Sequence, residues 1–242
     1  LQDIYSDVGY AHADISPRID QDPEKLEANV TYLINKGPIV HFEKIIIAGN
    51  TKTRDKVIRR ALRVYEQEPF SGKALKQSTK NLYRLDFFED IKVNTTEGSA
   101  EDKMVLRIDV TEKATGAFSF GAGYSSADSL FAMVSVSQRN LFGRAQILNV
   151  RAQLGGTSTN YTVGFTEPWL FDIPLSAGFD LYNTARDWDT YDKDSIGGTA
   201  RLGYALFDYT RVSLSYNYDE TTIKNLDDDA SSEIREFQGK NR

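Results

Sequence analysis

The chain holds few residues whose type and spacing could support chemistry. It has no cysteine, which excludes disulfides, thiolate metal ligands and a thiol nucleophile. Its two histidines, His12 and His41, lie far apart without a companion metal-binding or catalytic motif, so we expect ordinary structural or surface residues. No two carboxylates stand out by spacing as a general acid and base. We therefore expect no enzyme, no cofactor and no metal site.

Three short patterns remain as candidate sites. Residues 121–123 (Gly-Ala-Gly) imitate the start of a dinucleotide fingerprint, but Ser126 occupies the third glycine position and no helix pattern follows. An acidic segment lacks the glycine and final glutamate of a calcium loop, so we interpret it as solvated; its aspartates are Asp187, Asp189, Asp192 and Asp194. A basic cluster fits a partner-binding patch or a solvated helix face equally well; its members are Arg59, Arg60 and Arg63.

The charge distribution divides the chain near residue 115. Residues 1–115 hold 37 of the 64 charged residues, whereas residues 116–219 hold 17 of them but 18 of the 28 aromatic residues. The net charge of −6 argues against a nucleic-acid partner. We therefore expect a mixed α/β first half and an all-β second half.

The first half predicts a small β-α-α-β-β unit with both helices on one face of its sheet. Thr53 should cap the first helix, which should run to about Val64, and Ser71 should cap the second. The predicted strands are 41–48, 90–96 and 103–112. Residues 1–40 resemble the end of a similar preceding unit, with a helix end at 1–10 and strands near 13–20 and 26–35.

The second half alternates apolar and polar residues throughout, and we count seven strands between residues 116 and 219. Several are long enough to cross a bilayer, which takes about 9–11 residues in a tilted strand. This length favours a membrane β-barrel over a soluble sandwich. Aromatic residues near strand ends are predicted to lie at the membrane interfaces; they are Tyr124, Trp169, Phe171, Tyr182 and Tyr218.

Four motifs carry a resemblance that covers nearly the whole chain. Residues 49–60 (GNTKTRDKVIRR) and 82–90 (LYRLDFFED) resemble the last polypeptide-transport-associated (POTRA) domain of the bacterial outer-membrane β-barrel assembly factors. Residues 139–144 (RNLFGR) and 166–171 (TEPWLF) are similar to early barrel strands and turns of the same family. Ala145 departs from the family, which often has glycine there.

The resemblance implies a fold and a domain order. Residues 1–38 would end a preceding POTRA domain, 39–114 would form the last POTRA domain, and 115–242 would begin an antiparallel transmembrane barrel with about seven of sixteen strands. We expect the chain to be a fragment that cannot close a barrel. Because the sequence becomes polar after Asp219, we also expect it to leave the membrane there.

The resemblance also implies a function: assembly and insertion of outer-membrane β-barrel proteins. The partners would be unfolded outer-membrane proteins, periplasmic lipoprotein subunits of an assembly complex, and outer-membrane lipid, with the POTRA domains in the periplasm. The first barrel strand would form one side of a lateral seam that pairs with client strands; its residues are Gly116, Phe118, Ser119, Phe120, Gly121, Gly123 and Tyr124. The alternatives are a two-partner secretion transporter of the same superfamily and a soluble β-sandwich adhesin.

Overall fold

The computed structural model describes residues 1–22, 27–125, 129–207, 210–229 and 231–241. Leu26 and Ser126, which the sequence analysis used, lie outside these ranges. The chain forms two compact units, Leu1–Lys113 and Ala114–Arg242. Within the described ranges, no helix is both long and apolar enough to span a membrane.

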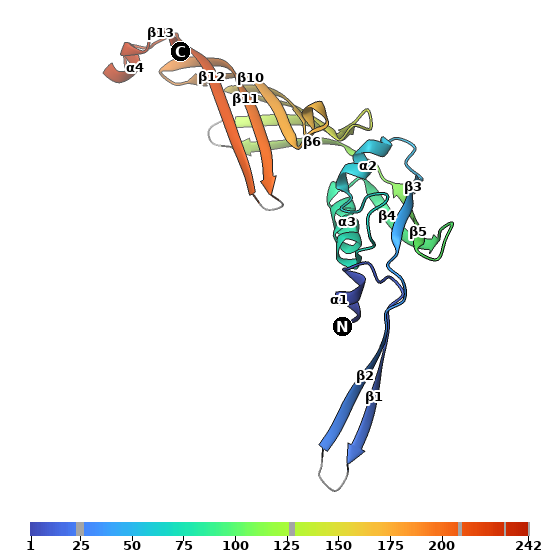
Figure 1. The fold of residues 1–242 in the computed structure, drawn as a ribbon. Coiled ribbons are helices and arrows are strands. Elements are labelled where there is room, and N and C mark those ends of the chain that lie inside the picture. The colour runs from blue at the N-terminus through green and yellow to red at the C-terminus, as the bar shows by residue number, and fades with distance from the viewer. Residues whose placement is uncertain (23–26, 126–128, 208–209, 230, 242) are drawn as a thin grey trace. The chain divides into compact units, whose positions relative to one another are not determined.

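The first unit opens with a short helix and a hairpin. Helix α1 spans Gln2–Ser6, and strands β1 (Asp14–Asp22) and β2 (Glu27–Asn35) pair antiparallel (Figure 1). Both strands lie close to the predicted ranges, 13–20 and 26–35. The described side chains of β2 are all exposed.

The rest of the first unit has the predicted β-α-α-β-β order. Its elements are β3 (His41–Ala48), α2 (Asp55–Ala61), α3 (Gly72–Leu85), β4 (Phe88–Glu97) and β5 (Lys103–Glu112). The three strands form one sheet in the order β3-β5-β4, in which β3 and β5 are parallel and β4 and β5 antiparallel. The two helices cover one face of it (Figure 1).

This unit folds around a core between the helices and the sheet. Phe42, Ile58, Leu82, Leu106 and Ile108 are almost completely buried, and they come from both helices and from two strands. Burying each such side chain contributes about 1.5–3 kcal/mol to the free energy of folding, so packing on this face of the sheet stabilises the domain. The residues of β5 alternate, and the even-numbered ones from 104 to 110 point into the core.

One helix boundary differs from the prediction. Thr53 does not cap α2; the N-cap is Arg54, without a side-chain hydrogen bond, and the helix ends at Ala61 rather than near Val64. The backbone becomes extended at Leu62, and the next amide, that of Arg63, donates to Ser78 Oγ at 2.7 Å. The cap of α3 is confirmed, since Ser71 Oγ accepts from the Ala74 amide at 3.2 Å.

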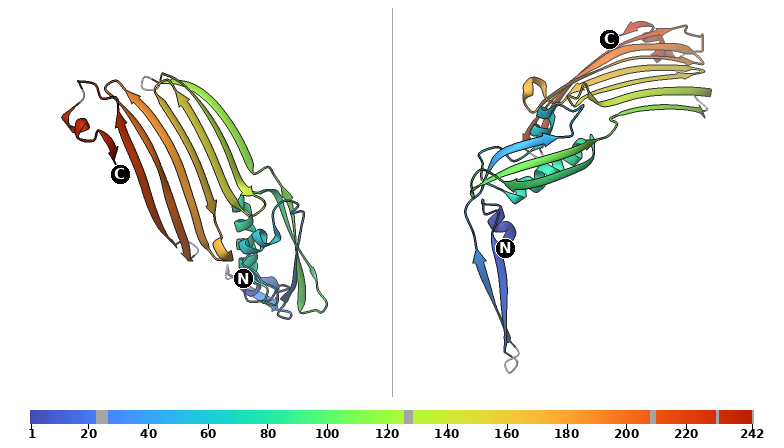
Figure 2. Two further views of the ribbon diagram at one scale, coloured as in Figure 1. Left: turned by 90° about the horizontal axis from the view of Figure 1, so that it is seen from above. Right: turned by 90° about the vertical axis from the view of Figure 1, so that its right-hand side faces the viewer.

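The second unit is a single antiparallel sheet (Figure 2). Its order is β13-β12-β11-β10-β9-β8-β7-β6, with a one-turn 3-10 helix at Leu170–Asp172 between β9 and β10. The seven long strands are β6 (Gly116–Ser125), β7 (Ser129–Leu141), β8 (Gln146–Gly155), β9 (Ser158–Glu167), β10 (Leu175–Trp188), β11 (Tyr191–Phe207) and β12 (Thr210–Lys224). They confirm the seven predicted strands, and the sheet does not close into a barrel.

The polar residues after Asp219 do not end the strand, and departure from the membrane there stays a prediction. Strand β12 continues to Lys224, where Ser195 and Thr221 side chains hydrogen-bond across β11 and β12 at 2.9 Å. A short helix α4 (Ser232–Glu236) follows, and β13 (Gly239–Asn241) returns to pair with β12. Polar residues continue a strand well when they pair across it, which composition alone does not reveal.

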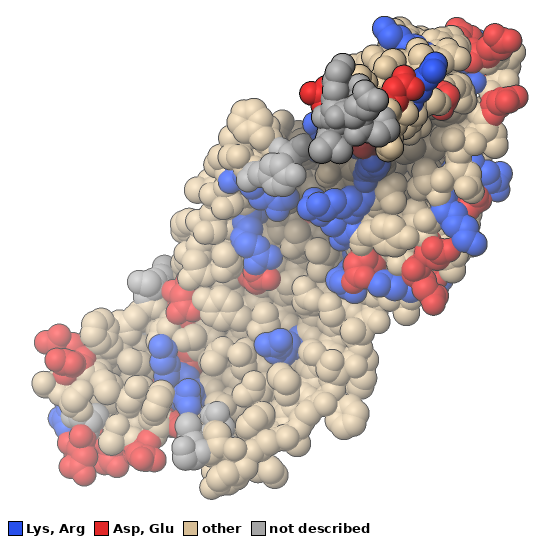
Figure 3. All heavy atoms as spheres, turned by 90° about the horizontal axis from the view of Figure 1, so that it is seen from below, with Lys and Arg blue, Asp and Glu red and all other residues tan. Residues whose placement is uncertain are grey.

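The register places apolar residues in continuous rows on one face of the sheet. One row runs Phe118, Val136, Val150, Val163 and Leu181 across five neighbouring strands. Four of these five side chains are at least 39% exposed and Val150 is 38% exposed, so no protein layer covers this face. In Figure 3 charged side chains crowd the first unit and are sparse on the visible face of the sheet.

Candidate functional site

Strand β6 lies at one end of the sheet and pairs only with β7 among the described strands. In an antiparallel sheet, every second residue of an edge strand directs its N–H and C=O away from its neighbour. This edge therefore presents a row of backbone donors and acceptors over ten residues. At the other end of the sheet, β13 covers part of the edge of β12.

The side chains of β6 divide by face as the alternation predicts. Phe118, Phe120 and Tyr124 share one face and are 66%, 82% and 79% exposed. Ser119, Gly121 and Gly123 occupy the opposite face, where their partners on β7 are Ser135, Met133 and Phe131. Further along the sheet this face carries mostly polar and small residues. The predicted seam residues thus all lie on the edge strand, with large apolar groups on one side and small groups on the other.

The start of β6 is anchored to β7 by one glutamine that the sequence analysis did not single out. Thr115 Oγ1 donates to Gln138 Oε1 at 2.6 Å, and the Asn140 amide donates to the same oxygen at 3.2 Å. The Arg139 amide donates to the Thr115 carbonyl at 3.1 Å. These bonds hold Thr115, the residue just before β6, while the outer edge of the strand stays open.

The turn after β7 is held by a second buried polar group. Asn140 is only 8% exposed, and its Oδ1 accepts from the Ala145 amide at 2.8 Å. Phe142, Gly143 and Ala145 all have positive φ, between 54° and 69°. Ala145, the departure from the family pattern, therefore sits in a left-handed conformation that favours glycine.

The face opposite the apolar rows is a hydrogen-bonded polar surface. Arg201 forms an ion pair with Asp180 and donates to Thr166 Oγ1 at 3.4 Å. Tyr182 Oη donates to Asp219 Oδ1 at 2.7 Å. Tyr182 therefore lies on the polar face, and its predicted place at the membrane interface is wrong. The reason is register, since Tyr182 pairs with Thr162 and Gly197 on that face.

The two edges of the three-stranded sheet differ in how far the chain itself covers them. Beside β3, the Phe42 amide donates to the Glu68 carbonyl at 3.0 Å and the Gln67 amide donates to the Phe42 carbonyl at 2.7 Å. The Ile45 amide donates to Glu66 Oε1 at 3.0 Å. The outer edge of β4 has no such strand-like partner among the described residues. It is the open edge of this sheet.

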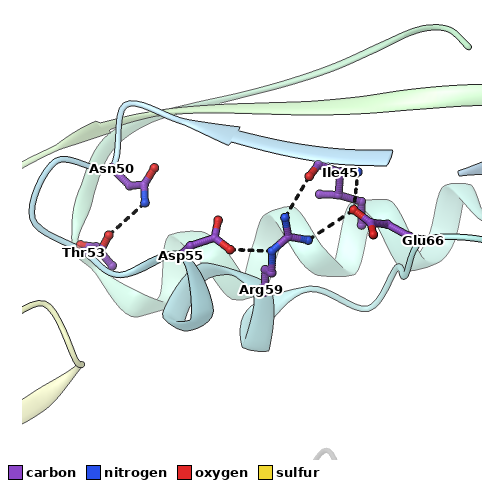
Figure 4. A network of polar contacts seen from close by, with 6 residues as sticks. All are labelled: Ile45, Asn50, Thr53, Asp55, Arg59 and Glu66. Atoms are coloured by element: carbon purple, nitrogen blue, oxygen red, sulfur yellow. Dashed lines mark hydrogen bonds and ion pairs between the residues drawn. The ribbon is translucent and has the colours of Figure 1, made fainter. Parts of the chain in front are cut away.

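The arginine cluster is partly engaged within its own domain (Figure 4). Arg59 Nε contacts Asp55 Oδ2 at 2.6 Å, its Nη1 lies 3.6 Å from Glu66 Oε1, and its Nη2 donates to the Ile45 carbonyl at 3.0 Å. These contacts tie α2 to β3. Arg60 and Arg63 lie on the same segment and also have interactions of their own.

A carboxylate clamp closes the loop before α2. Glu112, at the end of β5, accepts from the Thr51 hydroxyl at 2.8 Å and from the amides of Lys52 and Thr53 at 2.8 and 2.6 Å. Partial burial alone would raise the pKa of Glu112, but these hydrogen bonds lower that pKa from 4.5 to about 2. The partners are about 60 residues apart, so no local sequence pattern could reveal the clamp.

The remaining candidate residues do not come together into a metal or cofactor site among the described residues. The described residues contain no group of three or more His, Cys, Asp or Glu arranged to hold a metal ion. In the acidic segment, Asp194 pairs with Lys224 at 2.9 Å and Asp192 accepts from Asn225 at 2.6 Å. The Gly121-Ala122-Gly123 pattern lies inside strand β6, where no helix follows to bind a phosphate.

Two family models match this chain. The Omp85 superfamily domain matches residues 140–240, and a model described as surface antigen variable number repeat, a POTRA domain, matches residues 40–113. The outer membrane protein assembly factor BamA of Nitratidesulfovibrio vulgaris is 33% identical over 241 residues, covering 100% of this chain and 30% of the relative. The chain belongs to the Omp85 superfamily. Its sheet is the beginning of an outer-membrane barrel of that superfamily.

Other relatives agree with this assignment. BamA of Neisseria meningitidis serogroup B is 28% identical over 231 residues, which cover 92% of this chain and 29% of that protein. The crystal structure of BamA from Haemophilus ducreyi lacking POTRA domains 1–3 matches with a TM-score of 0.80 at 23% identity, over 93% of this chain and 43% of that chain. CdiB from Acinetobacter baumannii matches less well, with a TM-score of 0.55 at 16% identity over 90% of this chain and 44% of that chain. The chain spans about 30% of the length of the curated relatives.

Proposed function

We propose that the protein containing this chain assembles outer-membrane β-barrel proteins and inserts them into the membrane. The observation that carries this proposal is the open edge of β6, next to a fully paired sheet whose apolar face is exposed. The chain lies in the outer membrane, with its POTRA domain in the periplasm. We assign residues 1–38 to the end of a preceding POTRA domain, 39–114 to the last one and 115–242 to the barrel.

The mechanism is β-augmentation at the edge of β6. An incoming strand satisfies its own N–H and C=O groups on this edge, which gives affinity with little sequence preference. In lipid an unpaired backbone group costs several kcal/mol, so a client strand gains most by pairing before it enters the bilayer. No nucleotide or other energy source is required for this step.

The POTRA domain would supply two further binding surfaces. The open edge of β4 can receive an extended segment of a client in the same way, whereas the edge of β3 is covered by residues 65–70. The surface around Arg59, Arg60 and Arg63 would dock an acidic periplasmic lipoprotein partner. Arg59 would then position α2, because its guanidinium already contacts Asp55 and Glu66.

A photo-crosslinking amino acid at position 119 of the full-length protein tests the seam. Ser119 lies on the open edge strand, so it should capture unfolded outer-membrane proteins during their assembly. The matched control is position 135, because Ser135 pairs directly with Ser119 but lies on β7, which has strands on both sides. Capture of the protein's own last strand alone, or equal capture from both positions, would refute the seam.

A further inference from the structure

Most glycines in the strands of this sheet leave room for a side chain of the neighbouring strand. Strands β6, β9, β10 and β11 contain eight glycines, and at seven of them a neighbouring-strand side chain lies where a Cβ would be. In each case that side chain belongs to a residue paired directly with the glycine. Each of these seven glycines thus forms a recess for its cross-strand partner.

The recesses accept many kinds of side chain but no alanine or glycine. A Cβ at Gly123 would lie 2.8 Å from the Phe131 ring, and one at Gly197 would lie 2.5 Å from Cζ of Tyr182. The other partners are Gln138 at Gly116, Asp180 at Gly164, Thr166 and Arg201 at Gly178, Leu181 at Gly198, and Ser176 at Gly203.

Gly121 is the exception among these eight. Gly239 in β13 is also uncovered, but its φ of 98° itself favours glycine. No atom lies within 4 Å of a Cβ built there, although Met133 is its partner on β7. Its φ is not in the left-handed region, so its backbone suits any residue. Neither close packing nor backbone conformation within the described chain therefore requires glycine at position 121. On the side away from Met133, Gly121 lies at the open edge of β6.

We propose that Gly121 is a recess that determines specificity. When a client strand pairs with β6, the client residue directly opposite Gly121 places a large side chain over it, on the polar face of the sheet. This inference rests on the proposed function, because it needs a client strand on the edge of β6. The occupant is a strand with a residue larger than alanine at that register position. Such a residue buries its side chain over the glycine, as Phe131 does at Gly123. The recess thereby selects one register among those that the backbone alone would allow.

The first experiment maps this register. This chain has no cysteine of its own, so Gly121→Cys is placed in a full-length protein cleared of any other cysteine and paired with single cysteines along the last strand of a small outer-membrane barrel. The strongest disulfide should mark a client position whose native residue is larger than alanine. A native alanine or glycine at that position overturns the recess while leaving the seam intact. If Gly121→Cys links only to the protein's own last strand, both the recess and the proposed function fail.

The second experiment fills the recess. Gly121→Leu should reduce assembly of the native client at least tenfold, and truncating the client's opposite residue to alanine should restore most of that loss. Ala117→Leu is the matched control: it adds similar bulk on the same face of β6, and the client truncation should not rescue it. Normal assembly with Gly121→Leu, or equal rescue of both variants, overturns the recess.

Discussion

At the scale of single residues, the clamp at Glu112 gives the POTRA domain a dependence on pH. Its carboxylate has a pKa near 2 in the folded chain, below the ordinary 4.5. A group with a lowered folded pKa contributes stability that is complete above the unfolded pKa and is lost as pH falls through the folded one. The contribution should therefore be full at pH 7, decline below about pH 4.5 and vanish near pH 2.

The variant Glu112→Gln tests this contribution. We expect it to lower the free energy of unfolding by about 1–3 kcal/mol at pH 7, since it weakens three hydrogen bonds to a carboxylate. Urea unfolding of residues 1–113 from pH 7 to pH 2.5 should show the difference from the native chain shrinking. Glu101→Gln, in the exposed β4–β5 turn, is the control, and a difference that does not change with pH contradicts the clamp.

The turn residue Ala145 predicts a stabilising substitution. Its φ of 61° costs an L-residue about 1–2 kcal/mol, whereas glycine adopts this conformation freely. Part of that gain is offset by the greater chain entropy of glycine when unfolded, so Ala145→Gly should stabilise the full-length barrel by about 0.5–1 kcal/mol. Thermal unfolding in detergent measures it. Ala152→Gly, inside β8, should destabilise instead, and the same sign for both variants would show that the turn is not strained.

At the scale of elements, the alternation of β8 predicts opposite environments for adjacent residues. Leu148 pairs with Phe165 in the apolar rows, and Asn149 pairs with Gly164 on the polar face and accepts from Ser137 Oγ at 2.7 Å. Single cysteines at these positions in the full-length protein should report lipid at 148 and water at 149, by spin-label accessibility to oxygen and to a nickel complex. A dry protein environment at 148 in a detergent-free protein would favour the adhesin.

The elements that the sequence predicts best are those whose signal is local. Strands β3 and β5 have the predicted bounds, because alternation and turn residues define both ends. The start of α2 was not predictable, because the loop before the helix is bound by Glu112, which is distant in sequence and accepts from the Thr53 amide. The order β3-β5-β4 likewise depends on pairs far apart in sequence.

In the candidate site too, the features with a local signal were predictable and those that depend on strand pairing were not. Alternation alone assigned the residues of β6 to two faces. That Gly121 lacks a covering side chain could not be read from the sequence, because the cover of a strand glycine comes from partners on neighbouring strands. The family resemblance predicts that β6 forms one side of a seam, and the register shows which residue of β7 lies beside each of its residues.

At the scale of the whole chain, the two units bury apolar surface by different means. Every buried hydrophobic side chain among the described residues lies between Ala13 and Val110, within the first unit. Large apolar side chains of the second unit, such as Phe120 and Leu214, are exposed on the surface of the sheet. The first unit therefore carries its own core, and the second depends on lipid to cover its apolar face.

This difference predicts how the two units behave when they are separated. Residues 1–113 should stay monomeric in aqueous buffer and unfold cooperatively, because their core is internal. Residues 114–242 should aggregate without detergent, because their apolar rows and the open edge of β6 are both exposed. Sedimentation and circular dichroism with and without detergent micelles measure both outcomes. A monomeric, strand-rich second unit in buffer alone would mean that its apolar face packs against protein. That result would favour a soluble sandwich over a membrane sheet.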